Sequence, residues 1–205
     1  DVCMNLDAGW FADNGIAPPT DLDQLTEPAY RDLLVVPSPV TSSPGLAFLI
    51  GTVDRYGEDG WSEYWAQLEA NGVRVRPSWD DAYYSDYTVS GGDRPIVLSY
   101  ASSPPAEVVF SEGERTEPAS TVMLDSCTAQ VEYAGVLRGT SNPDAARAVV
   151  DWLLSPEVQA DVPLSMFVFP AVDGTPLPEV FDQWAARPIA PLTLDPCQIA
   201  ASRAD

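Results

Sequence analysis

A short turn with free hydroxyl groups is the first candidate for chemistry. The residues Thr41-Ser42-Ser43-Pro44-Gly45 precede a predicted helix that begins at Gly45. The backbone N–H groups of a helix N-terminus, together with the hydroxyls of Ser42 and Ser43, can bind an anion such as phosphate. The same pattern is also typical of an ordinary helix start, with a serine cap and proline in the first turn. From the residues alone, both interpretations stay open.

Three aromatic side chains form the second candidate group. Trp79 follows a predicted strand and Pro77, and Tyr83 lies one helical turn further on the same face. Tyr100 ends another predicted strand, which is where open α/β sheets bind ligands. Aromatic faces bind flat rings by stacking and cations by cation–π attraction. Packing in a hydrophobic core explains each of these residues as well, so the site remains a hypothesis at this point.

Several kinds of catalytic and metal site are excluded by composition. The chain has no His, which removes Ser-His-Asp and Cys-His catalysis and every His-containing metal site. Its three Cys residues are too far apart for a paired-cysteine metal site. Acidic pairs such as Asp80-Asp81 are expected among 31 acidic residues and indicate a solvated face. Nucleophile-elbow, phosphate-loop and dinucleotide motifs are missing as well. We therefore predict no enzyme, no cofactor and no metal.

The charge of the chain restricts its partners. Ten basic and 31 acidic residues give a net charge of −21, which disfavours nucleic acid and anionic membrane surfaces. No apolar run approaches the roughly 20 residues that span a bilayer, so we predict no membrane insertion. All ten basic residues are Arg, which indicates a coding bias toward high GC content.

The candidate residues need strands and helices to position them. Short apolar runs alternate with amphipathic segments, which predicts a layered α/β sheet. The segment 107–120 is acidic and irregular, and the chain beyond residue 170 is rich in Pro and predicts short surface pieces. We expect strands at 33–36, 73–76, 96–100 and 130–137, and helices at 21–30, 45–56, 60–70, 80–87 and 142–154, with another from 155.

Several segments, in this order, resemble the thiamine-binding proteins of bacterial ABC importers. They are VVPSPVTSSPGLAFL, RPSWDDAYY, IVLSYASSPPAEV, NPDAARAVVDWLLSPEVQADVP and FVFP, and the resemblance extends over residues 1–203. This resemblance implies a periplasmic-binding-protein type II fold, in which two α/β lobes close about a hinge on a small molecule. It also implies delivery of that molecule to an ABC permease.

The resemblance implies a division of the chain as well. Family members are longer at the front, so the chain is expected to be a fragment that lacks most of the first lobe. Residues 1–7 would be a lobe crossover, residues 8–125 the second lobe, and residues 126–205 the return crossover and C-terminal helices, partly first-lobe elements. The expected location is extracytoplasmic, either the periplasm or the cell surface, with a lipid anchor on a preceding segment in the latter case.

The same resemblance assigns roles to the candidate residues. Ser42, with Ser43 beside it, would lie at the hydroxyl or phosphate end of thiamine or a thiamine phosphate. Trp79 and Tyr100 match ligand-contacting aromatic residues of the family, and Tyr83 matches another family aromatic. Thiamine has a cationic thiazolium ring and a flat aminopyrimidine, both of which suit aromatic faces.

Two departures from the family pattern leave alternatives open. Phe167 stands where the family has a Trp that sandwiches the ligand, and Ala106 stands where it has a second Tyr. A domain that kept the fold and lost the ligand is therefore one alternative. Related iron-binding proteins use adjacent tyrosines as ferric ligands, so Tyr83-Tyr84 offers a ferric site as another. The resemblance also implies a disulfide between Cys3 and Cys127, which lie near the two lobe crossovers, and leaves Cys197 free.

Overall fold

A five-stranded mixed sheet organises the chain. The computed structural model describes residues 1–202. The order of strands across the sheet is β3 (Arg74–Arg76), β2 (Leu34–Pro37), β4 (Ile96–Tyr100), β1 (Val2–Asp7) and β5 (Ser120–Thr128). The α/β architecture predicted from the sequence is confirmed, and three of the strands lie within one residue of the predicted ranges at both ends.

Strand direction gathers several chain segments at one edge of the sheet. Strand β2 is parallel to β3 and β4, whereas β1 is antiparallel to β4 and β5. The register pairs Val2 with both Tyr100 and Thr128, so the ends of β4 and β5 meet beside the start of β1. The carboxyl ends of β2, β3, β4 and β5 therefore share one edge, which we call the carboxyl edge.

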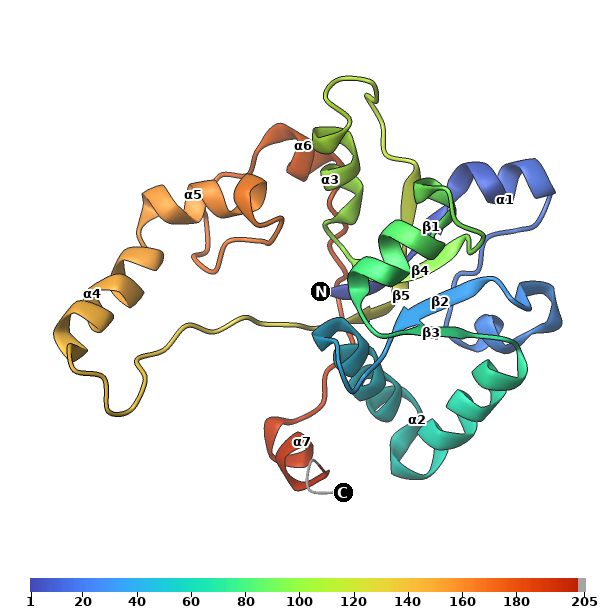
Figure 1. Ribbon diagram of the computed structural model, residues 1–205, viewed down its shortest axis with the longest axis horizontal. Coiled ribbons are helices and arrows are strands. Elements are labelled where there is room, and N and C mark those ends of the chain that lie inside the picture. The colour runs from blue at the N-terminus through green and yellow to red at the C-terminus, as the bar shows by residue number, and fades with distance from the viewer. Residues whose placement is uncertain (203–205) are drawn as a thin grey trace.

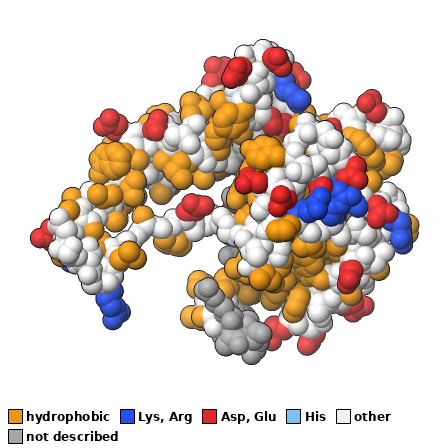
Figure 2. All heavy atoms as spheres, in the orientation of Figure 1, with side chains coloured by type: hydrophobic (Ala, Val, Ile, Leu, Met, Phe, Trp, Pro, Cys, Tyr) orange, Lys and Arg blue, Asp and Glu red, His pale blue; other side chains and the backbone are white. Residues whose placement is uncertain are grey.

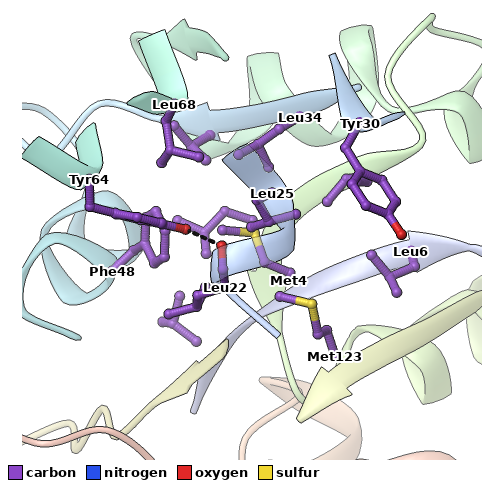
Figure 3. Close-up of a cluster of buried hydrophobic side chains, with 14 of the residues drawn as sticks. Met4, Leu6, Leu22, Leu25, Tyr30, Leu34, Phe48, Tyr64, Leu68 and Met123 are labelled. Atoms are coloured by element: carbon purple, nitrogen blue, oxygen red, sulfur yellow. Dashed lines mark hydrogen bonds between the residues drawn. The ribbon is translucent and has the colours of Figure 1, made fainter. Parts of the chain in front are cut away.

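One face of the sheet carries the main hydrophobic core (Figure 3). It is covered by α1 (Ala8–Asn14), the 3-10 turns η1 (Asp23–Thr26) and η2 (Pro28–Tyr30), and α2 (Ser43–Ala70). The Tyr64 hydroxyl donates to the Leu22 carbonyl at 2.8 Å, which ties α2 to the segment before η1. Gly57 interrupts α2 with φ 74°, so the two helices predicted at 45–56 and 60–70 meet at this kink.

The opposite face is covered by two shorter elements. These are the π-helical turn η3 (Asp81–Asp86) and helix α3 (Ser103–Phe110). The 3-10 turn η4 (Thr88–Ser90) follows η3. Buried Tyr87 and Tyr83 pack there against Val35 and Val97, whose neighbours along β2 and β4 face the main core. Strands β2 and β4 are therefore buried on both faces, which explains their largely apolar sequences.

The C-terminal third leaves the sheet and returns to it (Figure 1). An extended segment leads to α4 (Pro143–Leu153) and α5 (Pro156–Ser165), which project away from the sheet. Helix α6 (Glu179–Trp184) then packs against α3, and α7 (Pro196–Ser202) follows. The predicted helix starts are confirmed, because Asn142 and Ser155 cap α4 and α5 with their side chains. Hydrophobic side chains remain exposed along α4 and α5 (Figure 2), among them Val149, Trp152 and Leu164.

Three expectations about local structure are wrong. Residues 130–137 do not form a strand. The strand in this part of the chain is β5, because Ser120–Thr128 lies beside the free side of β1 and pairs with it. The segment expected to be irregular from Glu107 onward starts inside helix α3, which extends to Phe110. This helix begins at Ser103 because two prolines in its first turn favour a helix start. The helix expected at 21–30 is divided into two 3-10 turns, because Pro28 lacks the N–H that a continuous helix needs.

Both crossover cysteines lie at the carboxyl edge. Cys3 and Cys127 are fully buried and joined by a disulfide, the pairing that the resemblance implies. Cys197 is free and exposed. The assignment of segments to two lobes stays a prediction.

Candidate ligand-binding cleft

Three of the predicted site residues lie at, or just after, the ends of neighbouring strands. Ser42 comes five residues after β2, Trp79 three residues after β3, and Tyr100 is the last residue of β4. Because these strands are parallel, their ends deliver all three residues to the carboxyl edge. Open α/β sheets bind ligands in this position.

The aromatic residues form a continuous surface. The rings of Trp79 and Tyr83 stack at 4.9 Å with an interplanar angle of 19°. Tyr100 lies 6.0 Å from Trp79 at an angle of 50°, so these two rings are tilted walls rather than a closed stack. Tyr84 meets the edge of Trp79 and is 58% exposed. The sequence expectation that Trp79 and Tyr83 share a face agrees with this stacking.

A carboxylate anchors Tyr83 from behind. The Tyr83 hydroxyl donates to Glu107 Oε1 at 3.0 Å, and Glu107 Oε2 accepts from the backbone N–H groups of Ala119 and Ser120 at 2.8 and 3.0 Å. Burial raises the pKa of Tyr83 well above its ordinary value, and the charge of Glu107 raises it further. Tyr83 is therefore a neutral phenol at physiological pH.

Tyr100 has a different environment at the other end of the aromatic surface. Burial raises the pKa of its phenol, and Glu132 adds to the shift. The nearby Ser43 side chain opposes the shift. Tyr100 therefore lies close to the turn that begins α2.

A cleft of about 710 Å³ opens in front of these rings. Its walls include Trp79, Tyr83, Tyr100 and Phe167, so the structure brings four of the six predicted ligand-binding residues together. Drug-sized ligands occupy pockets of roughly 300–1,000 Å³. Three carboxylates and a single guanidinium line the cleft within the described part of the chain, namely Glu107, Glu114, Glu132 and Arg115. The lining therefore favours a cation.

The other two predicted residues lie beside this cleft and not in its wall. Ser42 is the N-cap of α2, but its side chain makes no capping hydrogen bond. Ser43 lines a neighbouring hollow together with Leu46, Gln130 and Glu132. A Cβ atom at Gly45 would lie 2.4 Å from the Pro37 carbonyl oxygen, so glycine allows α2 to start directly against the end of β2. This close approach keeps both serines at the carboxyl edge.

The far wall is formed by α3 and the segment after α5. Ala106 lies on α3 facing the cleft, and Phe167 contributes to the same wall with a backbone φ of 53°. Ser102 holds that backbone through a hydrogen bond from its hydroxyl to the Phe167 carbonyl. Phe110, one helical turn beyond Ala106, lies 4.9 Å from the Phe167 ring and is 68% exposed.

Sequence reasoning missed several residues of the cleft. Glu107 and Phe110 belong to a segment read as irregular, although Pro104-Pro105 after a serine signals a helix start that would have placed them on one face with Ser103. Glu132 was assigned to a strand. Arg115 follows the helix on a loop and shows no signal in the sequence.

The sheet and the cleft together point to one class of protein. The arrangement is an α/β sheet with an aromatic, acid-lined cleft at the carboxyl edge, and residues 1–202 contain no group of three potential metal-binding side chains of the His, Cys, Asp or Glu type. No helix in that range is long and apolar enough to cross a membrane. An aromatic cleft with a few charged groups, at this place in an α/β sheet, is typical of small-molecule-binding proteins.

The chain belongs to the bacterial extracellular solute-binding protein family, whose sequence pattern matches residues 1–188. It is 28% identical over 208 residues to the thiamine-binding periplasmic protein of Escherichia coli and equally similar to that of Brucella suis over 210 residues. The alignments cover 99% of this chain but only 61% and 60% of those proteins, so the chain spans about three fifths of its relatives' length. The protein is extracytoplasmic, and its relatives are solute-binding proteins rather than enzymes.

Solved structures show the same fold. A periplasmic thiamin binding protein superposes with a TM-score of 0.81 at 24% identity, covering 99% of this chain and 60% of that one. Iron-bound HitA from Pseudomonas aeruginosa superposes with a TM-score of 0.66 at 18% identity, covering 93% and 58%. The periplasmic-binding-protein type II fold implied by the sequence is thus confirmed.

Proposed function

We propose that this protein captures thiamine, or a phosphate ester of thiamine, as the solute-binding component of an ABC importer. The observation that carries the proposal is the aromatic cleft. Trp79, Tyr83, Tyr100 and Phe167 come from three separate segments and line a single cavity at the carboxyl edge. A chance collection of core residues would bury these faces, whereas Trp79, Tyr100 and Phe167 remain only half-buried.

The charge of the site suits this ligand. A thiazolium ring has a permanent positive charge, and each aromatic face that it meets contributes roughly 0.5–2 kcal/mol of cation–π attraction. Glu107, Glu114 and Glu132 add negative charge around the same cavity. The net charge of −21 extends this attraction to the approach of the ligand.

The turn at Ser42 and Ser43 supplies contacts at the edge of the cavity. In the proposed complex these hydroxyls, together with the N-terminus of α2, meet the hydroxyl or phosphate end of the ligand. Two features support this role: the Ser42 side chain has no capping bond to lose, and Ser43 lies close to Tyr100.

Transport follows from the family and the relatives. Solute-binding proteins of this fold close two lobes on a ligand by a hinge motion and present it to a membrane permease. In the proposal the cleft described above is one side of that closed site. The thiamine-binding names of the relatives support thiamine as the cargo.

A ferric role is less well supported by the geometry. Ferric ligation by tyrosine needs phenolate oxygens, but the Tyr83 hydroxyl donates to Glu107 and its pKa is raised.

Calorimetric titration of the intact natural protein tests the proposal. Thiamine, thiamine monophosphate, thiamine pyrophosphate and ferric citrate would be titrated separately. We expect saturable one-to-one binding of at least one thiamine compound and none of ferric ion. Ferric binding alone would favour the iron alternative, and absence of any binding would favour a domain that kept the fold and lost its ligand.

A further inference from the structure

A chain of buried hydrogen bonds lies directly behind the aromatic surface. The indole N–H of Trp79 donates to Ser99 Oγ at 2.9 Å, and Ser99 Oγ is 2.8 Å from Ser103 Oγ. Ser103 Oγ also accepts from the backbone N–H of Tyr100 at 3.1 Å. We call Ser99 and Ser103 the serine pair.

The serine pair joins three elements that carry the cleft. Ser99 lies on β4 and is fully buried, while Ser103 is the first residue of α3 and is 6% exposed. Trp79 reaches the pair from the segment between β3 and η3. The side chain of Trp79 and the backbone of Tyr100 are therefore fixed by the same two hydroxyls.

The serine pair fixes the orientation of the Trp79 indole. A half-buried indole ring can rotate about its side-chain bonds unless its single N–H has a fixed acceptor. The bond to Ser99 holds that N–H toward the sheet, so the ring keeps one face on Tyr83 and a tilt of 50° to Tyr100. Loss of the acceptor would leave the N–H to seek another partner at the expense of this geometry.

We propose that Ser99 is a positioning residue, which holds the Trp79 ring at the angle that receives the ligand ring and, through Ser103, holds the backbone of Tyr100 beside it. The inference rests on the proposed function for its ligand, thiamine. Aromatic side chains that are already fixed lose little conformational entropy when the ligand binds. Ser99 therefore raises the affinity although it does not contact the ligand.

The first test follows the indole directly. In a ¹H–¹⁵N spectrum of the intact protein, the Trp79 indole resonance is identified by its absence in Trp79→Phe. In Ser99→Ala we expect this resonance to move upfield and to exchange faster with water, because its hydrogen bond is lost. Ser103→Ala, which leaves the Trp79–Ser99 bond in place, should shift it less.

A matched control separates positioning from general loss of stability. Ser126 is also a fully buried serine of the same sheet, and its hydroxyl bonds Met4 N–H and the Met123 carbonyl away from the cleft. Ser126→Ala should lower the melting temperature while leaving the Trp79 resonance in place.

The second test measures affinity. Ser99→Ala should raise the dissociation constant for thiamine roughly three- to tenfold, as expected from the loss of one hydrogen bond, and Ser126→Ala should change it less than about twofold. An unmoved indole resonance in Ser99→Ala overturns the proposal, and so does unchanged affinity when the resonance moves. If the parent protein binds no thiamine, the proposed function fails, and the indole resonance still decides whether Ser99 positions Trp79.

Discussion

Replacing Trp79 by alanine is the sharpest perturbation of the proposed cleft. The Trp79 ring stacks on Tyr83 at 4.9 Å and lies 6.0 Å from Tyr100, so it is the central ring of the aromatic surface. Its removal takes away one cation–π partner, worth roughly 0.5–2 kcal/mol, together with buried aromatic area against the ligand.

These contributions give the expected size of the effect. A combined loss of roughly 1–3 kcal/mol corresponds to a rise in the dissociation constant for thiamine of about fivefold to 150-fold. Calorimetric titration of the intact protein measures it. Trp79→Phe keeps a face but loses the bond to Ser99, so its affinity should fall between those of the parent and the alanine variant.

A second tryptophan provides the control. Trp10 is also half-buried, but it lies on α1 at the other end of the sheet and packs on Phe11 with ring centroids 5.2 Å apart. Trp10→Ala should lower the melting temperature and leave thiamine affinity unchanged. The reasoning is refuted if Trp79→Ala binds thiamine as the parent does, or if both variants lose affinity in proportion to their loss of stability.

The remaining predictions concern an anion contact, a disulfide and an ion pair. Ser42→Ala should weaken binding of thiamine phosphates more than that of thiamine, with little loss of stability because Ser42 makes no capping bond; equal titration curves for parent and variant would contradict this role. Replacing Cys3 and Cys127 by alanine should reduce the free energy of unfolding in urea by up to about 4–5 kcal/mol, since the bond spans a sequence separation of 124, and an unchanged denaturation midpoint would count against it. The hydrogen bond from Arg76 lowers the pKa of buried Asp86, because it favours the charged carboxylate of the folded protein. The ion pair therefore stabilises the fold above about pH 4, the ordinary pKa of Asp, and this contribution is lost as the pH falls through the lowered pKa. Asp86→Asn should therefore cost about 1–3 kcal/mol at pH 7, and this cost should shrink as the pH falls through the lowered pKa of Asp86, whereas a cost that does not change with pH would show that the charge is not responsible.

Short-range patterns in the sequence were enough for the central sheet. The strands β2, β3 and β4 are short apolar or alternating runs between clear breakers, and they were predicted nearly to the residue. Strand β1 is not among the expected strands and the expected strand at 130–137 lies beyond β5, because both β1 and β5 depend on a partner far along the chain. Strand β5 pairs with β1 across more than 110 residues, and no local pattern contains that information.

The candidate site was predictable in part for the same reason. Trp79 and Tyr100 stand at strand ends, and parallel strands bring their ends together. Phe167 comes from a segment far along the chain, and the Ser102 hydroxyl holds its backbone at the cleft. Only the family resemblance indicates Phe167 as a site residue. The anchoring of Tyr83 by Glu107 depends on how α3 packs beside β5, which the sequence does not reveal.

A crystal structure of the intact protein with bound thiamine tests the central claim most directly. We predict electron density for the ligand in the cleft at the carboxyl edge, with one of its rings against Trp79 and Tyr100 and with Phe167 on the opposite side. Thiamine bound elsewhere on the protein, with this cleft empty, would contradict the account.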